Sequence, residues 1–160
     1  MNIKRPIWAA LLLPLLMSAG CAGLRPAEKE SQRQTIPKSM MRADGSVRVD
    51  TENEKIAELW KQAEDARLAD NDPGALALIY QALELSPQNS LLWSRAAELQ
   101  LDGLESAQAE SFAMKSNMFA GKNNALLYRN WLIIEHARDQ RGDLLGVRSA
   151  HKKVQHYQYQ

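Results

Sequence analysis

A pattern of small and large apolar residues that recurs about every 34 residues is the strongest constraint on the fold of this chain. Leu59 and Trp93 occupy equivalent places one period apart. The spacing of Ala75, Ile79 and Ala82 puts small, large and small side chains on one face of a helix. A period of this length predicts hairpins of two helices that stack in series, each in contact only with its neighbours.

Residues 51–158 are predicted to form six helices, because apolar residues recur there at helical spacing and no run alternates as a strand would. Thr51 and Glu54 are expected to open the first helix as a capping box. Asp72 is expected to cap the second, with Pro73 in its first turn. Breaks are expected at residues 70–74, 86–87, 102–103, 121 and 141–143. The six apolar faces are expected to be Ile56, Leu59, Trp60, Ala63 and Ala66; Ala75, Leu76, Ile79, Ala82 and Leu83; Leu92, Trp93, Ala96, Ala97 and Leu101; Ala107, Ala109, Phe112, Ala113 and Met114; Leu126, Leu127, Trp131, Ile134 and Ala137; and Leu144, Val147, Ala150 and Val154. The predicted fold class is all-α, with three helix-turn-helix hairpins.

The hairpins resemble tetratricopeptide repeats. The first unit carries the family's small, large, small and proline positions as Ala75, Ile79, Ala82 and Pro87, with Ala63 and Ala66 as the small residues of the facing helix. In the second unit, Ser116 replaces a small apolar residue and Gly121 stands where proline would. In the third, the helices on either side of Gly142 fit registers one residue apart. A generic helical bundle is the alternative interpretation.

The N-terminus has the features of an export signal. Lys4 and Arg5 precede an apolar stretch at residues 7–17, which is followed by small residues up to Gly20. This stretch is shorter than the roughly 20 apolar residues of a membrane-spanning helix. Residues 1–20 are therefore expected to be a signal peptide that is removed.

Cys21, the only cysteine of the chain, follows this signal directly. Residues 17–21 resemble a bacterial lipobox, although Ser18 stands where leucine is more usual. The resemblance implies that Cys21 carries a diacylglycerol and an acylated amine. Because Ala22 follows instead of aspartate, it also implies the outer membrane, facing the periplasm. The alternative is a free or buried thiol in an exported chain with no second cysteine to pair with.

Residues 21–50 are expected to form a disordered tether, because their apolar residues recur at neither helical nor strand spacing. A flexible segment of about 30 residues has a root-mean-square span of roughly 30 Å and a maximum reach of roughly 100 Å. The domain at residues 51–158 can then work well away from its membrane.

Charge is balanced overall but uneven along the chain. After removal of residues 1–20, 18 basic residues face 19 acidic ones, which gives no reason to expect a nucleic acid partner. Residues 52–110 contain 12 acidic and 4 basic residues, whereas residues 121–160 contain 3 and 7.

The sequence predicts no catalytic, metal or cofactor site. His136, His151 and His156 lack further ligands at metal-binding spacing and are expected to be solvated. No phosphate-binding loop or serine elbow is present in the sequence. Adjacent Glu64 and Asp65 diverge on a helix and do not form a catalytic pair. We therefore expect a binding protein without enzymatic activity, cofactor or small-molecule substrate.

The tetratricopeptide resemblance implies a concave face, made by the first helix of each hairpin, that binds a partner protein. Projected onto this sequence, it predicts the partner-binding residues Trp60, Glu64, Arg67, Ser94, Glu98, Leu101, Tyr128, Trp131, Glu135 and Arg138. Aromatic residues and arginine are common anchors of interfaces. Each tryptophan has core packing as its alternative role.

In its order of lipobox, tether and short repeat domain, the chain resembles the outer-membrane lipoproteins that activate class A penicillin-binding proteins. The resemblance implies that the partner is the periplasmic domain of such a bifunctional synthase, in peptidoglycan synthesis. Two alternatives are an assembly factor for outer-membrane proteins, pili or secretins, and an adaptor for a periplasmic protease or peptidoglycan hydrolase.

Overall fold

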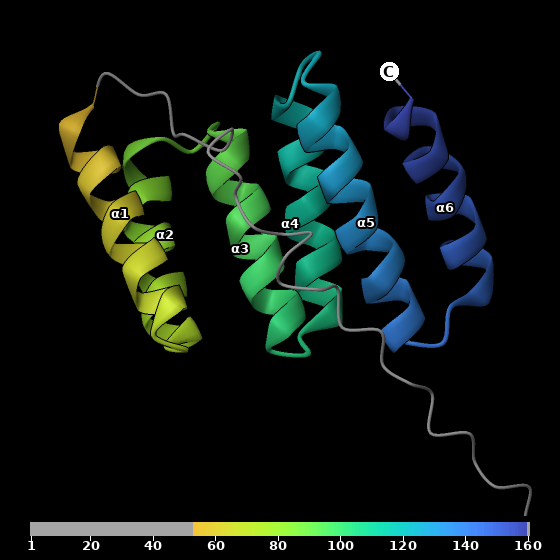
Figure 1. The fold of residues 1–160 in the computed structure, drawn as a ribbon, viewed down its shortest axis with the longest axis horizontal. Coiled ribbons are helices and arrows are strands. Elements are labelled where there is room, and N and C mark those ends of the chain that lie inside the picture. The colour runs from red at the N-terminus through yellow and green to blue at the C-terminus, as the bar shows by residue number, and fades with distance from the viewer. Residues whose placement is uncertain (1–52, 160) are drawn as a thin grey trace, which may run out of the picture. The chain divides into compact units, whose positions relative to one another are not determined.

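The computed structural model describes residues 53–159, and within them every regular element is an α-helix (Figure 1). The helices are α1 (Glu54–Leu68), α2 (Asp72–Leu85), α3 (Ser90–Asp102), α4 (Ser106–Phe119), α5 (Asn124–Gln140) and α6 (Leu144–Gln158). The all-α prediction is confirmed. The predicted signal peptide, the lipidated Cys21 and the tether lie outside the described residues.

The helices form three hairpins, α1–α2, α3–α4 and α5–α6, which follow one another along the domain (Figure 1). Successive hairpins meet where α2 packs on α3 and α4 packs on α5, and α3 also packs directly on α5. This arrangement confirms three stacked helix-turn-helix units. No helix within residues 53–159 is long and apolar enough to cross a membrane.

Asparagine residues cap most of the helices. Asn53 caps α1 and accepts hydrogen bonds from the backbone N–H groups of Lys55 at 3.0 Å and Ile56 at 3.4 Å. Asn71 caps α2, so the prediction of Asp72 was wrong by one residue. The prediction that Thr51 and Glu54 open α1 was also wrong, because Asn53 lies beside the free N–H groups of the first turn and satisfies two of them.

The core consists mainly of two clusters. The first joins α1, α2 and α3, and the second joins α3, α4, α5 and α6. Alanine is fully buried wherever hairpin helices approach closely, as at Ala75, Ala82 and Ala109. Three residues predicted on apolar faces, Ala107, Met114 and Leu144, are instead exposed. Helix α4 turns Ser106, Ala109, Ala113 and Ser116 inward, so Ala107 and Met114 lie about 100° away from the core, and Leu144 is only the first residue of α6.

Each hairpin turn contains one residue in the left-handed conformation: Asp70 (φ 57°), Leu104 (φ 63°) and Gly142 (φ 72°). Asp70 and Leu104 lie one repeat period apart, whereas Gly142 follows Leu104 at a longer interval. Helix α5 is accordingly longer, with 17 residues against 13 in α3. The four added residues displace the turn and α6 by four positions from the 34-residue period, and not by the one residue expected from the sequence.

Candidate functional site

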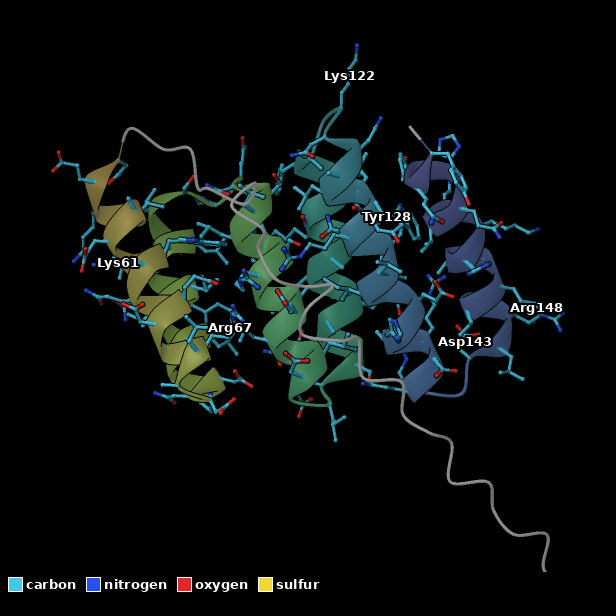
Figure 2. The ribbon with its side chains drawn as sticks, viewed as in Figure 1. Lys61, Arg67, Lys122, Tyr128, Asp143 and Arg148 are labelled. Atoms are coloured by element: carbon cyan, nitrogen blue, oxygen red, sulfur yellow. The ribbon has the colours of Figure 1, made fainter. Side chains whose placement is uncertain are left out.

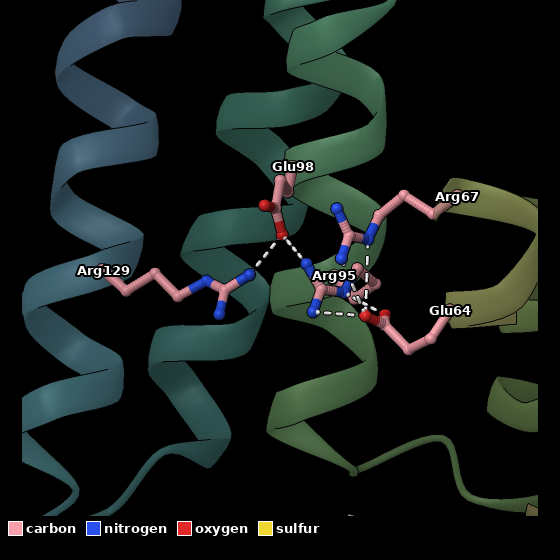
Figure 3. A network of polar contacts seen from close by, with 5 residues as sticks. All are labelled: Glu64, Arg67, Arg95, Glu98 and Arg129. Atoms are coloured by element: carbon pink, nitrogen blue, oxygen red, sulfur yellow. Dashed lines mark hydrogen bonds and ion pairs between the residues drawn. The ribbon is translucent and has the colours of Figure 1, made fainter. Parts of the chain in front are cut away.

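A network of ion pairs connects the first helices of the three hairpins (Figure 3). Arg95 on α3 reaches back to Glu64 on α1, with its Nε 2.7 Å from Oε1 and its Nη2 3.2 Å from Oε2. Glu98 on α3 accepts from Arg95 and from Arg129 on α5. We call these four residues the ion-pair ladder. Arg67 adjoins it and pairs with Glu64 at 3.1 Å.

The ladder follows the sequence period. Glu64 and Arg95 are 31 residues apart, as are Glu98 and Arg129, and the second pair lies one repeat period after the first. Each glutamate therefore meets the arginine of the following hairpin. Neither arginine was predicted from the sequence, although their recurrence at the repeat period is a signal from which they could have been found.

The centre of the ladder is withdrawn from solvent. The side chains of Arg95 and Glu98 are 1% and 3% exposed. The Arg95 guanidinium also lies 5.3 Å from the ring centroid of Trp60, a cation–π contact. Burial lowers the pKa of Arg95 from its ordinary value, and the nearby Glu98 carboxylate opposes that shift. Acids and arginines alternate along the ladder, and each hairpin is ion-paired to the next by it.

The predicted partner-binding residues of the first two units belong to this ladder or lie close to it. Trp60 is partly buried and packs against the first core cluster. In the middle unit, Ser94, Glu98 and Leu101 are 2%, 2% and 4% exposed, and Leu101 belongs to the second core cluster. The structure thus brings Trp60, Glu64, Arg67 and Glu98 together. The three predicted residues of the middle unit, however, are buried and not on a surface.

The predicted residues of the third unit either pack toward the core or make polar contacts with neighbouring helices. Tyr128 is half-buried on α5 (Figure 2), and Trp131 packs partly against the second core cluster. Glu135 lies 2.9 Å from His151 on α6. Arg138 donates to Glu110 on α4 at 2.8 Å and to Ser149 on α6 at 2.8 Å. It therefore ties three helices together.

A buried polar junction adds a further connection between hairpins. The Ser116 hydroxyl on α4 donates to the Ser90 carbonyl at 2.7 Å and accepts from the Asn130 amide at 2.7 Å. The same amide donates to the Asn117 side chain at 2.9 Å. Ser116 and Asn130 are fully buried, so these bonds orient α3, α4 and α5 in an apolar surrounding.

The three histidines do not form a site together. His151 and His156 are exposed, and the His156 ring lies edge-on to Tyr157. His136 is half-buried, contrary to the expectation of full solvation, and this burial lowers its pKa. Among residues 53–159, no group of three or more His, Cys, Asp or Glu side chains could hold a metal ion.

The domain is similar to a solved structure, the globular C-terminal domain of P. aeruginosa LpoP. The two superimpose with a TM-score of 0.62 at 24% sequence identity, over 66% of this chain and 99% of the other. No family model matches the chain, and no curated protein matches it. At this identity the likeness establishes the fold.

Proposed function

We propose that this chain is an outer-membrane lipoprotein that faces the periplasm and that binds and activates a class A penicillin-binding protein in peptidoglycan synthesis. One observation carries the proposal: the three-hairpin domain matches 99% of the LpoP globular domain. The sequence resemblance to lipoprotein activators of such synthases points to the same group. The domain has the architecture of a protein-binding repeat array.

The proposal also includes the way in which residues 1–50 anchor the protein to its membrane. Residues 1–20 act as the signal peptide, Cys21 carries the lipid, and residues 21–50 form the tether. Two or three acyl chains hold a protein stably at a membrane, since each buried methylene adds about 0.8 kcal/mol. With a maximum reach of roughly 100 Å, the tether lets residues 51–158 meet a synthase that is held in the opposite membrane.

Activation of the synthase would depend on the fixed arrangement of the three hairpins. An activator shifts a conformational equilibrium only by the difference between its affinities for the two states. The buried ladder and the Ser116 junction fix the three hairpins relative to one another. The domain therefore presents a preformed surface, and activation requires this surface to bind the active synthase conformation more tightly than the resting one.

The test is a pull-down with the full-length chain from detergent-solubilised envelope, followed by a glycan-polymerisation assay on any synthase recovered. We expect recovery of a class A synthase and a faster polymerisation rate when the protein is added. Recovery of secretin, pilus or barrel-assembly proteins, without an effect on polymerisation, would move the function to envelope assembly.

The anchor is tested separately with Cys21→Ala. This variant is expected to leave the membrane fraction while its domain keeps the same circular dichroism spectrum and the same stimulation of the purified synthase. A variant that remains in the membrane fraction would contradict lipidation at Cys21.

A further inference from the structure

The first helix of each hairpin has a face that points toward the next hairpin. The ladder identifies it, because Glu64 meets Arg95 of the second unit and Glu98 meets Arg129 of the third. By the repeat period, the face comprises three equivalent positions in each unit: Trp60, Glu64 and Arg67; Ser94, Glu98 and Leu101; and Tyr128, Leu132 and Glu135.

In the middle unit this face is covered by α5, and its three residues are at most 4% exposed. In the third unit no seventh helix follows within the described residues, and Tyr128, Leu132 and Glu135 are all only half-buried. We call these three residues the open end face. It continues the internal interface of the array. Within residues 53–159, α6 reaches it at Glu135 through His151, and no helix of a further hairpin lies on it.

The residues of the open end face differ from those of the internal ones. Leu132 stands where the other two units have the glutamates of the ladder, and Tyr128 replaces the small Ser94. A further hairpin with an arginine at the ladder position would leave that cation unpaired against Leu132. A second copy of this chain would bring Lys61, the equivalent of Arg95, to the same place. The face is therefore suited to an apolar residue, and a second copy that continued the array in the same register would not fit it.

The surface beside the open end face is basic. Helix α6 carries Arg148, Lys152 and Lys153, all exposed, and it has no acidic residue from Leu144 to Gln158. His151 of α6 contacts Glu135 of the face directly, and Arg148 lies one turn earlier on the same helix, extending away from the other helices (Figure 2). Charge complementarity therefore favours an occupant with acidic flanks.

We propose that an amphipathic helix of the partner protein docks on the open end face, with apolar residues against Tyr128 and Leu132 and carboxylates toward Arg148 and Lys152. The helix takes the place that α5 takes on the second unit. The identity of the partner as a synthase rests on the proposed function, whereas the chemistry of the docking helix follows from the face itself.

The first test measures the affinity of the full-length protein for the purified synthase. Leu132→Glu is expected to weaken binding about tenfold, because it removes an apolar contact and repels acidic flanks. Met118→Glu is the matched control: it adds the same charge at a side chain of α4 that is 78% exposed, and it is expected to bind as the wild type does. Circular dichroism checks that both variants keep the fold.

A second pair of variants tests the charge. Arg148→Glu combined with Lys152→Glu is expected to weaken binding by about tenfold or more. Lys55→Glu combined with Lys61→Glu, on exposed positions of α1, is its control and is expected to have little effect. Equal losses from both pairs would overturn the assignment of the acidic flanks to the α6 end.

A photo-crosslinking amino acid at position 132, with position 118 as control, identifies the occupant. Cross-links from position 132 alone to an acidic amphipathic helix of another protein support docking. If that protein is not a synthase and the wild type does not stimulate polymerisation, the proposed function fails while the docking site stands. Cross-links to residues 21–50, to a second copy or to nothing overturn docking, as does undiminished synthase binding by Leu132→Glu. Those outcomes leave the proposed function intact.

Discussion

Arg95 on α3 and Glu64 on α1 form an ion pair between two helices of different hairpins, at 2.7 Å from Nε to Oε1. The pair recurs one period later between Arg129 and Glu98. The repeat thus extends beyond apolar packing to buried charge. Since a buried ion is costly without its partner, the pairing specifies which helix lies beside which.

Arg95→Leu should destabilise the domain by about 3 kcal/mol. Removing one partner of a buried pair typically costs about 3–5 kcal/mol, and the low end applies because Glu64 keeps Arg67 and Glu98 keeps Arg129. Urea unfolding followed by circular dichroism measures the loss. Arg148→Leu, at an exposed arginine, is the control and should change stability by less than about 0.5 kcal/mol. Equal stability of the two variants would contradict a structural role for the ladder.

Ser116→Ala should destabilise the domain by about 1–2 kcal/mol, because it removes two buried hydrogen bonds and leaves the Ser90 carbonyl without this donor. Ser111→Ala, at an exposed position of the same helix, provides the comparison and should change stability by less than about 0.5 kcal/mol. Thermal unfolding of both variants against the wild type checks the difference. An unchanged melting temperature for Ser116→Ala would mean that the junction contributes nothing.

Leu104→Gly should stabilise the domain by about 1 kcal/mol, because Leu104 holds a left-handed conformation that costs a side chain roughly 1–2 kcal/mol. Leu104 is 55% exposed, so the apolar burial that the variant loses offsets part of this gain. Gly142→Ala should lower the free energy of unfolding by about 1 kcal/mol. The φ of Gly142 is 72° and an added Cβ would meet nothing within 4 Å, so the whole loss comes from backbone strain. Gly103→Ala, at φ −74°, is the control and should be close to neutral. The free energy of unfolding should therefore be highest for Leu104→Gly, intermediate for Gly103→Ala and lowest for Gly142→Ala.

Stability should fall as the pH drops below about 6.5, the ordinary pKa of histidine. Burial lowers the pKa of His136 in the folded state, while Glu135 and Asp139 oppose the shift. As the pH falls, the unfolded chain therefore takes up this proton first, and the folded state loses stability until the pH passes the lowered pKa. His136→Gln should reduce the difference in unfolding free energy between pH 7 and pH 5.

Much of the fold is predictable from the sequence because it depends on local patterns. Apolar spacing predicts six helices, and Ser86, Gly103 and Arg141 end their helices at the expected breaks. The caps of α1 and α2 are displaced because several neighbouring residues can cap a helix, and the choice depends on where the first turn begins. The third unit could not be placed because the extra turn of α5 changes its register.

The candidate site was less predictable, since it depends on contacts between hairpins. Projection of the repeat pattern finds Glu64 and Glu98 but treats them as parts of a surface. Their burial depends on Arg95 and Arg129, each 31 residues further along the chain. Trp131 and Arg138 show the same limit. Trp131 packs against the second core cluster, and Arg138 bonds to α4 and α6.

The connection between α1 and α3 also has a mechanical consequence. It consists of the long side chains of Glu64, Arg95 and Trp60. A force applied through the residues before Asn53 enters the domain at α1, so this ion pair and the α2–α3 packing bear the load first. Under tension we expect the first hairpin to separate from the array before the other two, because the second core cluster joins both helices of those two hairpins.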